Sequence, residues 1–135
     1  MRNHVKRLVA GDDLKGSLAA LMSECGFQSA VVLSVVGSLM VAHLRAAGGK
    51  NVLEIEGPLE IVGATGTLAP AAMHVHLAIA DQKGDVFGGH LLDGCIVSST
   101  VEVVLTEVAG WRFGRELDTK TGYNELVALQ NMGSK

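Results

Sequence analysis

Residues 74–90 read HVHLAIADQKGDVFGGH, and this stretch decides how the surrounding chain folds. The apolar and β-branched residues on either side of the turn-like loop Asp81–Asp85 are typical of two short strands. Because residues i and i+2 of a strand point to the same face, His74 and His76 project together. The stretch therefore predicts an antiparallel hairpin with two histidines on one face.

The length of the loop decides on which face the third histidine of the stretch lies. If the loop has five residues, Ala80 lies opposite Val86 and His76 lies opposite His90. The three imidazoles then share one face, whereas a loop one residue shorter would turn His90 to the other face. The candidate site depends on the longer loop.

Three neutral imidazoles within reach of one point are a common ligand set for Zn²⁺ or another borderline divalent metal, with one position left open for water or substrate. We therefore predict a metal site at His74, His76 and His90, with zinc as the first candidate ion. Gly88 and Gly89 precede His90 and would permit a bulge or a close backbone approach there. Histidines at i and i+2 are also common as partly buried or interface residues, and this alternative stays open.

The rest of the chain repeats the pattern of short β-branched runs between glycine or aspartate turns. Spacings of about ten residues between such runs are typical of consecutive antiparallel strands. The predicted strands cover residues 2–9, 27–36, 39–46, 52–56, 59–68, 73–80, 86–92, 95–108 and 111–116. The polar tail after Asp118 carries a few apolar residues that can dock on the domain.

Residues 13–25 are the one segment with clear helical periodicity. Its apolar residues recur at intervals of three and four, as in an amphipathic helix: Leu14, Leu18, Leu21, Met22 and Cys25. Asp12 or Asp13 can cap the start, and Gly26 stands where a left-handed residue commonly ends a helix. The sequence thus predicts an α+β fold, a strongly curved antiparallel sheet with one main helix.

The composition predicts a single domain over residues 1–135. Hydrophobic residues make up 48% of the chain and charged residues 19%, which excludes intrinsic disorder. No internal repeat or low-complexity block marks a boundary. Because one helix cannot cover both faces of so apolar a sheet, we expect a homo-oligomer.

The sequence also favours a cytoplasmic location without membrane association. Cys25 and Cys95 are far apart, as expected of reduced thiols, and the first residues lack the apolar run of a secretory signal. The longest apolar stretch, 30–44, is interrupted and shorter than the roughly 20 residues of a spanning helix.

Charge and motifs exclude several classes of function. A formal net charge of −3 provides no basis for strong sequence-independent binding to nucleic acid. The sequence has no phosphate-binding loop, dinucleotide fingerprint, Cys-His finger or nucleophile elbow. No catalytic motif is recognisable, so enzymatic activity stays an open question.

Four further residues are weaker candidates for contact with a ligand or partner. Gly37 and Ser38 can present backbone N–H groups to an anion, or form a turn between strands. Arg45 ends an apolar strand and can form a structural ion pair or anchor an anionic ligand. Glu60, like Glu102, lies in an apolar strand and needs a partner, which could be the metal site or Arg45.

Motifs along nearly the whole chain occur in an order that points to one family. They are Leu8–Leu14, Gly37-Ser38-Leu39 with Leu44-Arg45, Gly57–Ile61, Gly66-Thr67-Leu68, the block HVHLAIADQKGDVFGGHLLDGCIVSSTVEVVL, and Arg115–Asp118. In this order the sequence resembles the PPC family (plants and prokaryotes conserved domain), known in plants from AT-hook nuclear-localised proteins. The resemblance implies a homotrimer, a DNA-binding role, and a metal-holding cluster at His74, His76 and His90 with Arg45 and Glu60 in neighbouring motif positions.

The sequence departs from the plant proteins because it has no Arg-Gly-Arg segment of the AT-hook type. Since the phosphate backbone supplies most non-specific affinity, we expect the chain alone to bind DNA weakly.

Three hypotheses for the function remain. The chain is a homotrimeric DNA-binding or regulatory domain that acts mainly through association, a metal-dependent enzyme or small-ligand-binding protein, or a pH-responsive oligomerisation module.

Overall fold

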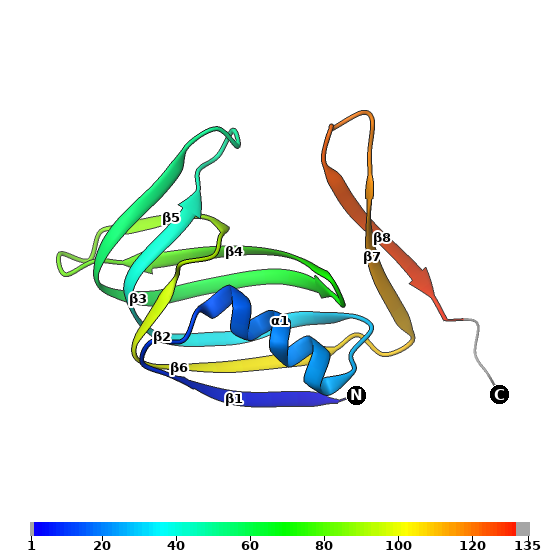
Figure 1. Ribbon diagram of the computed structural model, residues 1–135, viewed down its shortest axis with the longest axis horizontal. Helices are drawn as coiled ribbons and strands as arrows, with labels where there is room; N and C mark the ends of the chain where they lie inside the picture. The colour runs from blue at the N-terminus through cyan, green and yellow to red at the C-terminus, as the bar shows by residue number, and fades with distance from the viewer. Residues whose placement is uncertain (1, 132–135) are drawn as a thin grey trace.

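The computed structural model describes residues 2–131, which form one helix and eight strands (Figure 1). In chain order the elements are β1 (Asn3–Val9), α1 (Leu14–Cys25), β2 (Ala30–Arg45), β3 (Val52–Ala69), β4 (Ala72–Ala80), β5 (Val86–Leu91), β6 (Ile96–Glu107), β7 (Trp111–Leu117) and β8 (Asn124–Gln130).

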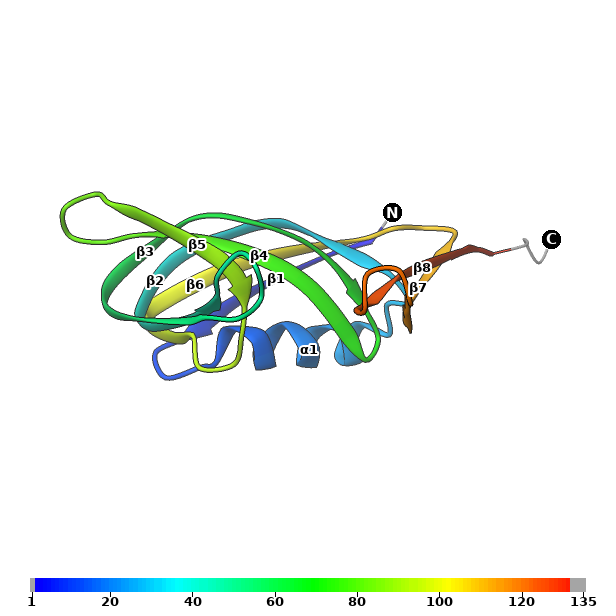
Figure 2. The ribbon, with the colours of Figure 1, turned by 90° about the horizontal axis from the view of Figure 1, so that it is seen from above.

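Six strands form an antiparallel sheet in the order β1-β6-β2-β3-β4-β5. The sheet curves so strongly that β5 also pairs with the end of β2, where Leu44 lies opposite Leu91 and Arg45 opposite His90. Strands β2, β3, β4 and β5 are therefore joined in a closed circuit of pairings. Figure 2 shows α1 lying across one face of this curved sheet. The predicted α+β class, with one helix on a curved antiparallel sheet, is confirmed.

The helix begins and ends as its sequence predicts. The Asp13 carboxylate accepts a hydrogen bond from the Gly16 N–H at 2.8 Å, and Gly26 takes the left-handed conformation with φ of 65°. The apolar stripe is buried against the sheet through Leu14, Leu18, Leu21 and Met22. With 12 residues, this one helix of the described chain is too short to cross a membrane.

The sheet face opposite α1, which we call the open face, carries exposed apolar side chains. They alternate with core residues along three strands and are 45% to 68% exposed: Val5 and Val9 on β1, Leu33, Val36 and Met40 on β2, and Val62 on β3. No helix within residues 2–131 covers this face. The core, in contrast, is one cluster between α1 and the other face of the sheet.

Two pairs of predicted strands are each one continuous strand. We expected breaks near Gly37 and Gly57, but Gly37 lies within β2 and pairs with Ile61 on one side and Val101 on the other. A Cβ on Gly57 would lie 2.8 Å from the carbonyl oxygens of Leu39 and Met40. These glycines permit close packing of neighbouring strands and do not form turns.

The end of the chain forms a strand, where the sequence predicted only a polar tail with apolar residues able to dock. Residues Asn124–Gln130 form β8, which pairs along its whole length with β7 in a separate two-stranded sheet. In Figure 1 this hairpin stands apart from the six-stranded sheet. The alternation in β8 is too weak to identify it, because only Val127 among its seven residues is even half-buried.

Candidate functional site

The β4–β5 hairpin sets the histidine register. Its loop has the predicted five residues, and the Asp81 carboxylate accepts hydrogen bonds from the backbone N–H groups of Lys83 and Asp85 at 2.9 and 3.0 Å. Ala80 consequently lies opposite Val86 and His76 opposite His90. The predicted register is confirmed, and all three imidazoles share one side of the hairpin.

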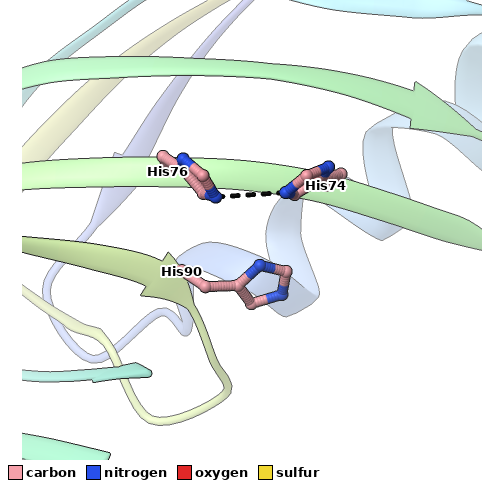
Figure 3. A group of neighbouring side chains, drawn as sticks. All are labelled: His74, His76 and His90. Atoms are coloured by element: carbon pink, nitrogen blue, oxygen red, sulfur yellow. Dashed lines mark hydrogen bonds between the residues drawn. The ribbon is translucent and has the colours of Figure 1, made fainter. Parts of the chain in front are cut away.

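The three rings converge on one point (Figure 3). The Nε2 atoms of His74 and His76 are 3.1 Å apart, and one nitrogen from each of the three rings lies within 4.8 Å of the others. Two imidazole ligands of a tetrahedral Zn²⁺ have nitrogens about 3.3 Å apart, given Zn–N bonds of about 2.0–2.1 Å. His74 and His76 already have this spacing, and the third ring needs to approach by no more than about 1.5 Å.

The surroundings of His74 and His90 favour the neutral imidazole, which is the form that binds a metal. Burial, and next the positive charge of Arg45, lowers the pKa of His90 to about 4. The pKa of His74 is also lowered, by burial first and then by His76 and Arg115. The Nδ1 atom of His90 is buried and has no hydrogen-bond partner among the described residues. Neutral donors and an unpartnered ring nitrogen fit a divalent metal ion.

Two adjoining cavities of about 490 and 470 Å³ open beside the histidines. Both are lined by Arg45, His74, His90 and Tyr123. The first extends below the turn between β2 and β3, residues 46–49, and the second extends toward the β7–β8 hairpin. The histidines thus border a space large enough for a small ligand.

The structure brings three of the six further candidates to this site, namely Arg45, Gly88 and Gly89. A Cβ on Gly89 would lie 2.6 Å from the Arg45 carbonyl oxygen, so the glycine lets β5 lie directly against the end of β2. This contact places Arg45 beside His90. Arg45 forms no salt bridge among the described residues, so the expected alternative of an ion pair with Glu60 or Glu102 is wrong.

The other three candidates line neither cavity. Gly37 and Ser38 lie in the middle of β2, where the Ser38 hydroxyl accepts a hydrogen bond from the Ser99 N–H at 3.1 Å. Glu60 is exposed on β3, opposite Ser38 and Ala80, and so needs no buried partner. Their place in the register explains the separation, because Glu60 lies several residues along β3 from Thr65, the partner of His76.

Three residues that line the cavities were not predicted as site residues from the sequence: Gly49, Arg115 and Tyr123. Arg115 on β7 donates a hydrogen bond to the Thr67 hydroxyl at 2.9 Å, and Thr67 pairs with His74. A Cβ on Gly49 would lie 3.0 Å from the Tyr123 hydroxyl and 4.0 Å from Arg45 Nε, so this glycine leaves space between them. No sequence signal marks these contacts, since they depend on where the β7–β8 hairpin docks.

Comparison with protein families gives one match over most of the chain. The model of the Plants and Prokaryotes Conserved (PCC) domain matches residues 1–109. The match contains the helix, the six-stranded sheet and all three histidines. The β7–β8 hairpin, with Arg115 and Tyr123, lies beyond it.

Curated relatives resemble the chain over a small part of their own length. The chain is 41% identical over 126 residues to the bifunctional protein GlmU of Synechococcus sp. strain JA-3-3Ab. It is 42% identical over 120 residues to the protein of the same name from strain JA-2-3B'a(2-13). These matches cover 93% and 89% of this chain but 20% and 19% of the relatives.

Solved structures share the fold over nearly the whole chain. A hypothetical protein from Salmonella enterica is 31% identical with a TM-score of 0.92, covering 97% of this chain and 95% of that one. A metal-containing protein from Archaeoglobus fulgidus is 25% identical with a TM-score of 0.77, covering 94% of each chain. A protein from Bacteroides thetaiotaomicron, described as a candidate DNA-binding protein, is 20% identical with a TM-score of 0.81 over 93% and 91%.

Proposed function

The chain belongs to the Plants and Prokaryotes Conserved (PCC) domain family, and on that premise we propose that it is a self-associating metal-binding protein. His74, His76 and His90 hold the ion, with zinc as the first candidate. The observation that carries the proposal is the convergence of three imidazoles, one nitrogen of each lying within 4.8 Å of the others. The metal-containing relative from Archaeoglobus supports it. A bound ion would act as a Lewis acid toward a ligand at its open position.

Metal analysis of the protein purified without a chelator or an affinity tag tests this proposal. We expect about one equivalent of a divalent metal per chain, or about one equivalent taken up when Zn²⁺ is added after dialysis. Replacement by Co²⁺ should give the visible absorption of a four-coordinate site. Failure of the protein to retain or take up any divalent ion would overturn the proposal.

The lowered pKa values favour a metal site over a pH-responsive module. A group whose pKa is about 4 becomes charged only below the range in which ordinary histidines titrate. His90 therefore keeps the same neutral form between about pH 5 and pH 8. A switch near neutrality would need imidazoles that change charge in that range.

Self-association as a homotrimer is part of the proposal and rests on the open face. Its exposed apolar side chains extend across β1, β2 and β3, and contiguous apolar surface of this kind is typical of an interface between subunits. The family resemblance implies three copies. A second and third copy of the chain are therefore the proposed occupants of the open face.

The double variant Leu33→Glu/Val36→Glu is expected to dissociate the assembly, because it would bury two carboxylates in an apolar interface. The mass measured by light scattering or native mass spectrometry should fall from that of three chains to that of one chain. Leu129→Glu on β8 is the matched control, since Leu129 is 50% exposed on the separate two-stranded sheet. A monomeric wild-type protein, or an unchanged mass for the double variant, would contradict the assignment.

DNA binding is the second candidate function, favoured by the description of the Bacteroides relative. The acidic balance of this chain predicts that such binding is weak and decreases steeply with salt, because few phosphates can be neutralised. A gel-shift series at low and moderate salt measures it. Absence of any shift at low salt with micromolar protein would remove this candidate.

The thiols are consistent with the cytoplasmic location that we propose. Cys95 is buried and Cys25 half-buried, and neither forms a disulfide. Burial raises the pKa of both thiols, which lowers the fraction present as the reactive thiolate. Reduced thiols of this kind suit a reducing compartment.

A further inference from the structure

We propose that the cavity beside the three histidines binds a small molecule with an anionic oxygen group, held between the guanidinium groups of Arg45 and Arg115. The proposal rests on the metal site proposed above and names the class of ligand for its open position. A carboxylate and a phosphate both qualify. Each has two or more oxygens that share negative charge and can accept hydrogen bonds from a guanidinium group.

The charges around the cavities favour an anion. Arg45 lines both cavities and Arg115 lines the second. Among the described residues, Glu125 is the one acidic residue that lines the second cavity, and none lines the first. Imidazole ligates a metal as an uncharged donor, so three histidine ligands would leave the full double charge of a bound cation uncompensated. A ligand that carries its own negative charge would restore the balance, and a neutral ligand would not.

The two arginines approach the histidine cluster from different strands, Arg45 beside His90 and Arg115 beside the partner of His74. Arg45 is fixed by strand pairing next to His90, and it has no carboxylate partner within the described part of the chain. Arg115 is oriented by its hydrogen bond to Thr67, the pairing partner of His74. Both arginines line the cavity that His74 and His90 border. Neither side chain is required for the metal itself.

The turn between β2 and β3 provides room for the ligand. Gly49 has φ of 72°, which favours glycine, and its missing side chain leaves the space between Arg45 Nε and the Tyr123 hydroxyl free. The Tyr123 hydroxyl lines both cavities and can donate a hydrogen bond to an anionic oxygen. The cavity that both arginines line has a volume of about 470 Å³, which fits a small metabolite and not a polymer.

Three residues that line the second cavity lie beyond the segment that the family model matches. Arg115, Tyr123 and Glu125 all belong to the segment beyond residue 109, where the family match ends. The histidines lie within the match. The histidines would therefore hold the ion, and the β7–β8 hairpin would contact the ligand that binds to it.

Calorimetric titration of the zinc-loaded protein with L-lactate and, separately, with inorganic phosphate tests the proposal and distinguishes the two sources of the anion. Propane-1,2-diol, which lacks the carboxylate of lactate, is the neutral control. We expect at least one anion to bind and the diol not to bind. Arg45→Met and Arg115→Met should each weaken binding by about tenfold or more, the loss of one charge-assisted hydrogen bond.

Arg112→Met is the matched control, because Arg112 is exposed on the same strand as Arg115 and lines neither cavity. It should leave anion affinity within about twofold of wild type. Thermal melts and zinc content are measured for every variant, and the two arginines provide independent tests if one variant folds poorly. Zinc bound without arginine-dependent anion binding overturns the anion site alone. A protein that takes up no metal overturns the proposed function, and this inference with it.

Discussion

Replacing His76 by alanine is expected to remove tightly bound metal from the protein. His76 lies opposite His90, and its Nε2 atom is 3.1 Å from that of His74, so it is one of the two donors that already have the spacing of metal ligands. Changes in residues that merely support a ligand weaken metal binding by about 10- to 100-fold, and loss of a ligand should exceed that range. Competition with a chromophoric chelator measures the affinity.

His4→Ala is the matched control for this experiment. His4 lies on β1, paired with Leu105 of β6, and is not part of the histidine cluster. It should keep the metal content and affinity of wild type. Equal metal content in the His76→Ala protein and its control would exclude the three-histidine site.

The substitution Gly37→Ala is expected to destabilise the fold more than any other single-methyl change in β2. A Cβ at this position would lie 2.1 Å from the Thr100 carbonyl oxygen and 2.7 Å from Val101 Cα, and the φ of 152° is unfavourable for alanine. Backbone cannot yield as a flexible side chain does, so β2 and β6 must separate. We expect a loss of roughly 3 kcal/mol or more in the free energy of unfolding, from overpacking and backbone strain together.

Chemical denaturation with urea measures this loss, with Gly114→Ala as the matched control. Gly114 lies within β7, and a Cβ there would meet no atom within 4 Å. The control should change the free energy of unfolding by less than about 1 kcal/mol. A similar result for both variants would mean that β2 and β6 do not approach as closely at Gly37 as the structure has them.

The register of the site could be predicted because it depends on local information. The number of residues between Ala80 and Val86 fixes which side chains lie opposite each other, and the strand period of two fixes their faces. The helix was equally predictable, since its Asp13 and Gly26 caps lie directly beside the apolar stripe. Both features need only residues that are close in the sequence.

The remaining features depend on contacts between distant segments. A glycine in a strand can mark a turn or a close approach, and only the partner strand decides between them; at Gly37 that partner is Val101. Likewise, Arg115 belongs to the site because its hairpin docks at Thr67, 48 residues away in sequence. The family pattern predicted Glu60 near the histidines. In the structure Glu60 pairs with Ala80, at a distance along β3 from Thr65, which pairs with His76.

The closed circuit of β2, β3, β4 and β5 has a consequence for how an ion would be exchanged. Strand pairing holds Arg45, His76 and His90 at fixed register positions, and the apolar core supports these strands from behind. The donor geometry is thus preorganised by the polypeptide, unlike that of a zinc finger, which is unfolded without its metal. Demetallation should leave an intact apoprotein, so the cation can equilibrate with its surroundings while the architecture persists.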